Sequence, residues 1–442
     1  MAEASLDRAL SPGAVLLLVL SAASPVLSVF VGGSGMLHLS GTTAALAFLV
    51  GGLLAALFAL LYAELGVRQP GAGGIYPGLA RLIGPGVAHG YMFMTILTAL
   101  PLNAYTALGL AGYLKVLGPE LPTVPVALIS LALAAGIAML NIRTSALVTG
   151  MFLGVELLAL AILSWVAATA PTVPLLPLLL PENIDWSLFG IAALGGLFWS
   201  GGANYMLYFA EEVSGGRAAL GPLTARAGAI CALTISLPML LLVPALAVTP
   251  ALFQSETPIA AFLDAQASPA VAQAVSAGVI AAVFNAQIVT IMAFARLVYA
   301  MGRDGVLPGA LGRLAARVSP RTQSPWGATL LITVASAATI GLGERWLLIL
   351  TSGNVADYAL VAIALLIARQ RGEATLWKAP AHPIIPLLAL LFTLAAVQSF
   401  WNDSETGRPS LILIGGTFAL AWGAWHVRRA AGHAPMLNTL ED

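Results

Sequence analysis

Two apolar runs, each long enough to cross a membrane, are interrupted near their middle. The run from about Trp186 to Val213 carries Ser200-Gly201-Gly202-Ala203-Asn204, and the run from Ala14 to Leu37 carries Ser21-Ala22-Ala23-Ser24-Pro25. A helix through Pro25 must kink or unwind, because proline lacks an N–H and its ring clashes with a preceding carbonyl. In hydrocarbon, irregular backbone survives only beside protein or a water-filled cavity. Paired interruptions of this kind predict a solute-binding site between the two breaks.

The composition agrees with a membrane protein. Of the 442 residues, 59% are hydrophobic and 9% are charged, and the mean hydropathy is +0.94, whereas soluble domains carry roughly 25% charged residues. The net charge is zero, which argues against a nucleic-acid partner and leaves membrane lipids as the expected surroundings. The single cysteine, Cys231, excludes an internal disulfide and a cysteine metal cluster.

The apolar runs predict an all-α polytopic membrane protein. A spanning helix needs about 20 apolar residues, and by that rule the chain contains about twelve spans. A short N-terminal segment, 1–12, precedes them and a C-terminal segment, 430–442, follows them. The predicted spans are 13–37, 42–66, 84–116, 123–140, 144–169, 187–212, 222–248, 270–301, 325–343, 345–368, 382–400 and 409–429.

The basic residues predict the orientation of these spans. Of the 19 Lys and Arg residues, all but Lys115, Arg345 and Arg408 lie at the chain ends or in the connections from an even-numbered to an odd-numbered span. Short cytoplasmic loops hold an excess of Lys and Arg. We therefore expect both termini on the cytoplasmic side of the plasma (inner) membrane.

Two connections on the opposite side are predicted to carry structure of their own. The segment from Pro171 to Asn183 is rich in proline and lacks N–H donors for a helix, so we expect an extended strap. The segment from Thr249 to Ala267 is expected to form a short surface helix over the mouth of the molecule.

Three stretches, in their order and spacing, resemble the amino acid, polyamine and organocation transporter family. They are Tyr62-Ala63-Glu64-Leu65 with Gln69-Pro70-Gly71-Ala72-Gly73-Gly74-Ile75-Tyr76, Ala210-Glu211-Glu212-Val213, and the segment from Ala295 to Pro308, which reads ARLVYAMGRDGVLP. They resemble the loop after the family's second helix, the end of its sixth, and its eighth helix with the following loop. The resemblance covers about residues 12–368 well and the last two spans only by hydropathy.

The resemblance implies a fold of two five-helix repeats of opposite topology, 13–169 and 187–368, followed by two further helices in 382–429. Helices 1 and 6 would be unwound around a central substrate, and helices 3, 8 and 10 would line the cavity. The family moves amino acids and amines by alternating access, commonly coupled to a proton gradient or to exchange. No internal sequence identity is visible, so the repeat assignment depends on hydropathy and the paired breaks.

Two departures from the family pattern bear on the substrate. Where amino-acid members usually have a glycine-rich break in helix 1, this chain has Ser24-Pro25-Val26-Leu27-Ser28, which weakens capture of a carboxylate by bare backbone N–H groups. Where many members have a lysine in helix 5, this chain has Glu156. A carboxylate in mid-membrane is costly unless it is protonated or paired. Glu156 is therefore predicted to carry a proton or to act as an amine counter-ion.

Asp357 is the other acidic residue well inside a span. It is predicted either to bind a cation or proton, or to cap a polar break at Ser352-Gly353-Asn354. Glu64, Glu211 and Glu212 lie near span ends, and we expect them to pair with Arg68, Arg81 or Arg217 at the ends of helices.

Polar residues within spans are expensive facing lipid, so those of helices 3 and 8 are predicted to face the cavity. These residues are Thr95, Thr98, Asn103, Tyr105, Asn285, Gln287 and Thr290. Phe198 and Trp199 flank the helix 6 break, where one ring is predicted to stack on an ammonium group or close the outer gate, and at least one of them to be a packing residue. The predicted substrate-binding residues are Ser24, Pro25, Val26, Ser28, Thr98, Asn103, Phe198, Trp199, Ser200, Gly201, Gly202, Asn204 and Asn285.

Catalytic and cofactor chemistry is not expected. Gly32-Gly33-Ser34-Gly35 is not followed by Gly-Lys-Ser or Gly-Lys-Thr, as a phosphate loop requires, and the five histidines show no metal-ligand pairing. The sequence predicts a proton-coupled secondary transporter of a small amine-bearing solute, an amino acid or polyamine, with Glu156 and Asp357 as proton-coupling residues. An amino acid exchanger and a sodium-coupled amino acid symporter remain alternatives, and a channel or membrane sensor is least favoured.

Overall fold

The computed structural model describes residues 6, 8–117, 121–183, 185–255, 257–351, 355–433 and 435. The regular secondary structure of this part of the chain is helical, apart from one isolated parallel bridge between Leu10 and Val213. The prediction of an all-α membrane protein is confirmed. The helices are α1 (Pro12–Ala23), α2 (Pro25–Leu27), η1 (Ser28–Gly33), α3 (Ser34–Ser40), η2 (Gly41–Thr43), α4 (Ala44–Arg68), α5 (Tyr76–Leu82), α6 (Pro85–Leu117), α7 (Thr123–Ala138), α8 (Ile142–Thr169), α9 (Leu175–Leu179), α10 (Trp186–Ser200), η3 (Ala203–Glu212), α11 (Gly216–Leu246), η4 (Pro250–Gln254), α12 (Pro258–Gln266), α13 (Pro269–Arg303), α14 (Gly309–Ala315), α15 (Trp326–Thr339), η5 (Ile340–Leu342), α16 (Glu344–Thr351), α17 (Ala356–Gln370), α18 (Ile384–Asn402) and α19 (Gly407–Ala430).

Helices lie over all of the predicted spans. In the described part of the chain, 8 helical runs are long and apolar enough to cross a membrane by length and composition. The first and second spans are joined in one such run, Pro12–Arg68, and two further apolar helices, Thr123–Ala138 and Trp326–Leu342, are shorter. The sixth span is divided because α10 ends at Ser200. The breaks and short helices thus account for the difference from twelve spans.

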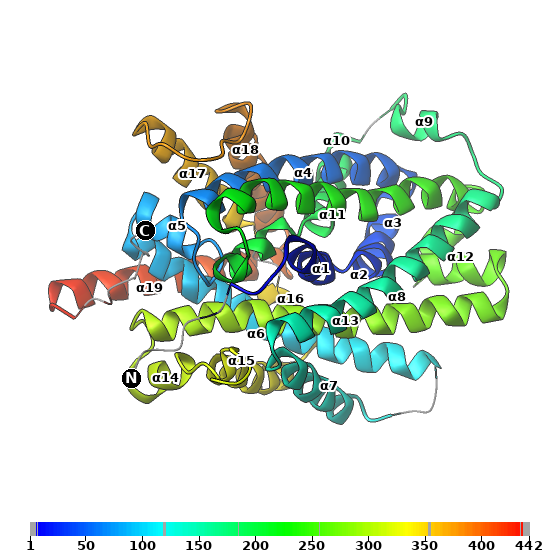
Figure 1. Cartoon of the computed structure of the whole chain (residues 1–442). Coiled ribbons are helices and arrows are strands. Elements are labelled where there is room, and N and C mark those ends of the chain that lie inside the picture. The colour runs from blue at the N-terminus through cyan, green and yellow to red at the C-terminus, as the bar shows by residue number, and fades with distance from the viewer. Residues whose placement is uncertain are drawn as a thin grey trace.

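The interrupted first span lies at the centre of the molecule. α1 contacts α8, α11 and α13, and α4 packs along α10 and α11. Figure 1 shows α1 and α2 between the α4–α11 pair and the long helix α13. α13 is buried over most of its length, whereas many side chains of α18 and α19 are exposed. The polar residues Asn285, Gln287 and Thr290 of α13 are buried and therefore face other helices.

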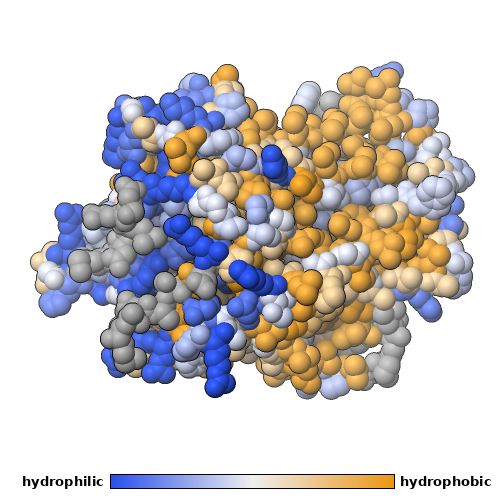
Figure 2. Space-filling model, in the orientation of Figure 1, coloured by the Kyte–Doolittle hydropathy of each residue, from blue (hydrophilic) through white to orange (hydrophobic). Residues whose placement is uncertain are grey.

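The surface separates into a hydrophilic end and an apolar belt, as Figure 2 shows. Large apolar side chains stand exposed on the belt, including Leu147, Trp165 and Leu233. A contiguous apolar surface of this kind marks contact with membrane in a protein of this composition. The hydrophilic end holds α5, α14 and the end of α19 (Figures 1 and 2).

One of the two predicted external connections has a different structure from the one expected. The segment 171–183, predicted to be an extended strap, contains the short helix α9, which Pro174 precedes as the N-cap residue. Pro177 lies in the first turn of α9, where the N–H groups have no partner within the helix, so proline costs no hydrogen bond there. The second connection forms two short helices, η4 and α12, so the helical prediction for it is confirmed.

Candidate functional site

The first span is broken at Ser24, as predicted. α1 ends with the Ser24 N–H donating to the Leu20 carbonyl at 2.9 Å, and Ser24 has left-handed dihedrals of φ 40° and ψ 81°. Pro25 follows and opens the single turn α2, because its fixed φ suits a first helical position. The chain then continues as the π-helical segment η1 from Ser28 to Gly33. The break thus comes from one strained residue placed directly before a proline.

The sixth span is broken at Gly201 and Gly202. α10 ends at Ser200, Gly202 has a φ of 151°, and η3 begins at Ala203 as a 3₁₀ helix. A residue with a side chain rarely adopts a φ of this value. The Gly201 N–H donates to the Phe198 carbonyl at 3.3 Å. The break therefore lies inside the predicted segment Ser200–Asn204, and its predicted position is confirmed.

The two breaks meet in the fold. A Cβ atom added to Gly202 would lie 2.6 Å from the Cβ of Ala23, the residue directly before Ser24. On the other side of the breaks, a Cβ added to Gly32 would lie 2.3 Å from the ring of Trp199. The first and sixth spans are therefore in close contact at two points, Gly202 with Ala23 and Gly32 with Trp199.

The second break keeps accessible surface although helices surround it. Gly201, Gly202 and Asn204 are partly exposed, while Ser200 and Ala203 are buried. Irregular backbone in a membrane protein is found beside protein or a water-filled cavity, and the partly exposed residues place this break at accessible surface.

A buried carboxyl group lies beside the first break. Glu156, in α8, is fully buried. The Ser24 hydroxyl donates to Glu156 Oε2 at 3.1 Å, and the Asn285 amide, from α13, donates to Glu156 Oε1 at 2.7 Å. No basic side chain of the described residues faces this carboxyl group. Asn285 Oδ1 is buried and accepts no hydrogen bond from the described residues. Glu156, Ser24 and Asn285 therefore form one buried polar cluster that links α8 and α13 to the first break.

Asp357, in α17, is the second buried carboxyl group within a span. Its Oδ1 atom accepts no hydrogen bond from the described residues, and no described basic side chain faces it. The Tyr358 hydroxyl lies 3.3 Å from the point where a Cβ of Gly201 would be, so this part of α17 approaches the second break. The polar break predicted at Ser352-Gly353-Asn354 lies outside the described residues.

Two tyrosine pairs near this region are not among the sequence predictions. The ring of Tyr358, the chain neighbour of Asp357, lies 6.0 Å from the ring of Tyr62 in α4. The rings of Tyr205 and Tyr208 lie 6.1 Å apart, and the position of this pair just after Gly201–Gly202 is the local signal for it in the sequence.

The remaining predicted residues divide between the breaks and other polar contacts. Pro25, Val26 and Ser28 are buried beside the first break, with the Ser28 hydroxyl donating to the Ala23 carbonyl at 3.0 Å. The Ser200 side chain is directed toward α11, where its hydroxyl lies 3.5 Å from the Ser236 hydroxyl.

Asn103 and Thr98 of α6 are held by contacts away from the breaks. The Asn103 amide donates to Ser336 at 3.3 Å and accepts from Thr290 at 2.9 Å, so it links α6, α13 and α15. The Thr98 hydroxyl donates to the Thr95 carbonyl of its own helix at 2.9 Å. These contacts satisfy buried polar groups between helices.

The aromatic pair at the sixth span points in two directions. Phe198 is 48% exposed, whereas Trp199 packs on Gly32 of the first span. The two rings contact each other with centroids 5.4 Å apart. Trp199 is therefore placed to pack the two spans together, and Phe198 is the ring open to a solute or to the surroundings.

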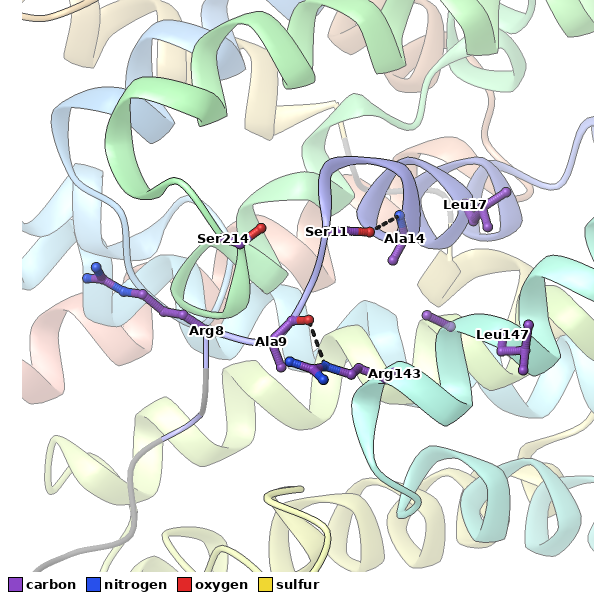
Figure 3. Close-up of a pocket in the computed structure, with 9 residues that line it drawn as sticks. Arg8, Ala9, Ser11, Ala14, Leu17, Arg143, Leu147 and Ser214 are labelled. Carbon is purple, nitrogen blue, oxygen red and sulfur yellow. Dashed lines mark hydrogen bonds between the residues drawn. The ribbon is translucent and has the colours of Figure 1, made fainter.

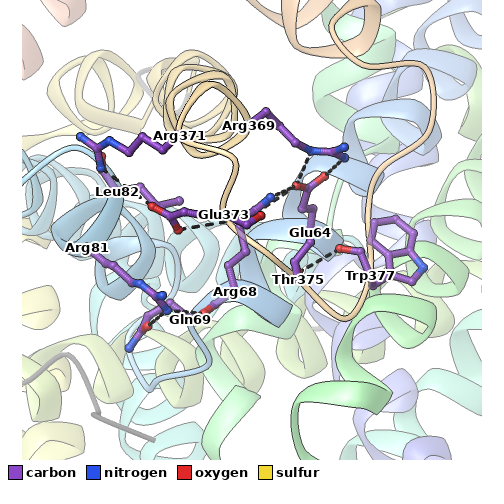
Figure 4. A network of polar contacts seen from close by, with 10 residues as sticks. All are labelled: Glu64, Arg68, Gln69, Arg81, Leu82, Arg369, Arg371, Glu373, Thr375 and Trp377. Carbon is purple, nitrogen blue, oxygen red and sulfur yellow. Dashed lines mark hydrogen bonds and ion pairs between the residues drawn. The ribbon is translucent and has the colours of Figure 1, made fainter.

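A network of ion pairs centred on Glu64 joins the end of α4 to the end of α17. The Glu64 carboxylate of α4 accepts from Arg68 at 2.7 Å, from Arg369 of α17 at 2.6 Å, and from the Ala379 N–H at 2.8 Å. Figure 4 shows the side chains of Arg68 and Arg369 at Glu64. The predicted Glu64–Arg68 pair is confirmed. It extends into a contact that joins α4, α17 and the segment after α17.

Two further ion pairs tie η3 to α13. Arg296 donates to both carboxylate oxygens of Glu212, and Arg303 donates to Glu211 Oε1 at 2.9 Å; the sequence reasoning did not name these two partners. Asp304, which follows α13, lies beside Arg303. Burial raises the pKa of the Asp304 carboxyl above its ordinary value, although Arg303 acts in the opposite direction.

Broken helices that meet inside a many-helix membrane protein are typical of transporters. The amino acid permease family model matches residues 10–420 of the chain. The chain therefore belongs to the amino acid permease family, whose members are transporters and not enzymes.

Curated relatives are transporters of several kinds. The chain is 27% identical over 363 residues to the mitochondrial cationic amino acid transporter 3 of Arabidopsis thaliana, covering 75% of this chain and 57% of the relative. It is 24% identical over 192 residues to the L-asparagine permease of Streptomyces coelicolor, covering 40% of this chain and 38% of the relative. It is 25% identical over 414 residues to the human Asc-type amino acid transporter 1, covering 87% of this chain and 76% of the relative. The matched region thus spans less than two thirds of the first two of these relatives.

Proposed function

We propose that this protein is a proton-coupled secondary transporter that moves a small amine-bearing solute across the plasma (inner) membrane by alternating access, with both termini in the cytoplasm. The observation that carries the proposal is the contact between the buried Glu156 carboxyl and Ser24 in the first break. A proton bound to Glu156 would remove the negative charge that faces the Ser24 side chain in this break. Proton binding and solute binding are then linked through one residue.

The energetic cost of burial supports a proton as the coupling ion. A carboxylate without a cationic partner is expensive inside a membrane protein, and among the described residues Glu156 accepts hydrogen bonds from the neutral donors Ser24 and Asn285. Protonation removes the charge and keeps both contacts, because a carboxylic acid retains acceptor capacity. Asp357, with its unpartnered Oδ1, is proposed as the second proton-coupling residue.

The two carboxyl groups support the proposed repeats, 13–169 and 187–368. Glu156 lies in the fifth span beside the break of the first, and Asp357 lies in the tenth span with its neighbour Tyr358 beside the break of the sixth. In an inverted repeat of five helices, the fifth and tenth spans correspond. Each proposed repeat therefore presents one buried acid to a break.

The solute is proposed to lie between Ser24–Ser28 and Ser200–Asn204. Its ammonium group would face the buried carboxyl groups and an aromatic ring, for which Phe198 is the more open candidate. The absence of glycines at Ser24-Pro25 favours a solute whose binding depends little on a carboxylate. The relatives named for cationic amino acids and for L-asparagine favour amino acids, so both classes enter the test.

Labelled-solute uptake into proteoliposomes tests the proposal. The screen compares diamines and monoamines with cationic, neutral and branched amino acids, each with an inward proton gradient, with sodium alone, and with neither. We expect saturable accumulation that collapses with the proton gradient and persists without sodium. Accumulation that follows sodium would support the symporter alternative, and strict one-for-one exchange without accumulation would support the exchanger. Transport limited to zwitterions would overturn the amine preference.

A further inference from the structure

The molecule contains a cavity that is separate from the breaks and lined by two arginines. It has a volume of about 590 Å³ and lies where α1 and α8 begin, as Figure 3 shows. Its lining residues are Arg8, Ala9, Ser11, Ala14, Leu17, Arg143, Ala146, Leu147 and Ser214. The volume is within the range of sites that bind small molecules.

The polar part of this cavity is positive. Arg8 and Arg143 are exposed, and none of the lining residues that the structure describes is acidic. Among the residues that the structure describes, neither arginine is part of an ion pair; Arg143 Nε donates instead to the Ala9 carbonyl at 3.1 Å. The N-termini of α1 and α8 also lie here and add partial positive charge. The cavity thus favours an anion such as a phosphate group.

The other part of the cavity is apolar and open. Leu17 and Leu147 line it and are 38% and 65% exposed. In Figure 3 these two leucines lie on the side away from Arg8, with Arg143 between them and Arg8. The same face carries further exposed apolar side chains of α8, such as Met151 and Leu158. An occupant must therefore combine an anionic group with an apolar chain.

We propose that this cavity binds the headgroup of an anionic phospholipid, with the phosphate between Arg8 and Arg143 and an acyl chain along Leu17 and Leu147. Basic pockets between membrane helices are suited to such headgroups. The bound lipid would join the start of α1 to α8 and to Ser214, which precedes α11. Because the Ser214 N–H also donates to the Leu10 carbonyl at 2.8 Å, the lipid would hold α1 in its contact with the sixth span.

The test measures the thermal unfolding midpoint of the full-length protein in mixed micelles that contain phosphatidylglycerol or phosphatidylcholine, and in micelles with inorganic phosphate alone. We expect phosphatidylglycerol to raise the midpoint and the other two to leave it unchanged. Arg8→Gln and Arg143→Gln should each weaken the apparent affinity for phosphatidylglycerol by about fivefold. Arg143→Lys should retain most of that affinity, because it keeps the charge.

Arg321→Gln is the matched control, because Arg321 is an exposed arginine in the basic loop after α13, outside the cavity. It should leave the effect of phosphatidylglycerol unchanged. The same loss in Arg321→Gln would show a general charge effect and overturn the proposal. An equal rise with inorganic phosphate would assign the cavity to a free anion, and an unchanged response in both Arg8→Gln and Arg143→Gln would show that no headgroup binds there.

Discussion

Replacing Gly202 with alanine tests whether contact between the two breaks stabilises the molecule. The added methyl group would lie 2.6 Å from the Ala23 Cβ, in a residue whose φ is 151°. Strain at such a backbone conformation costs about 1 to 3 kcal/mol, and overpacking costs about another 1 to 3 kcal/mol. Gly202→Ala should therefore lower the free energy of unfolding by roughly 2 to 6 kcal/mol.

The assay is reversible unfolding in mixed micelles, followed by circular dichroism, together with solute uptake. Gly190→Ala is the matched control, since Gly190 lies in the same span and a Cβ there meets nothing within 4 Å. That control should be neutral, or stabilising by up to about 1 kcal/mol, because alanine favours a helix over glycine. Equal stability of Gly202→Ala and Gly190→Ala would refute the close contact of the breaks.

Two further predictions concern the acidic residues. Glu64→Gln removes the charged partner that Arg68 and Arg369 share, so it should lower the free energy of unfolding by about 3 to 5 kcal/mol. Glu405→Gln is the control and should change that free energy little, because the ion pair between Glu405 and Arg345 is exposed. Similar losses in the two variants would contradict the stabilising role of the buried ion pairs. Asp357→Asn keeps the side-chain volume and should weaken the dependence of uptake on external pH, and a pH profile identical to that of the unsubstituted protein would exclude Asp357 from coupling.

Local signals made the two breaks predictable. Pro25 and Gly202 each disfavour a continuous helix whatever surrounds them, and the expense of a mid-membrane acid singled out Glu156 before any contact was known. The structure adds that Ser24 and Asn285 are the hydrogen-bond partners of Glu156. Ser24 precedes Glu156 and Asn285 follows it, each by more than a hundred positions along the chain.

Other features depend on how helices rotate against one another, which one sequence does not specify. The sequence places Ser200 at the second break, and the structure adds that its hydroxyl lies 3.5 Å from the Ser236 hydroxyl of α11. The sequence predicts that Asn103 faces inward, and the structure adds that its amide links α6 to α13 and α15. The contact between Tyr62 and Tyr358 joins α4 to α17, so no single stretch of sequence contains it.

The most direct test of proton coupling compares two activities of Glu156→Gln in proteoliposomes. Glutamine preserves the shape of the side chain, can accept from Asn285 and can donate to Ser24, but it cannot exchange a proton. We predict that exchange of labelled for unlabelled solute continues at close to its normal rate, while accumulation driven by a proton gradient is lost. Normal gradient-driven accumulation by Glu156→Gln would contradict the assignment of the coupling proton to this cluster.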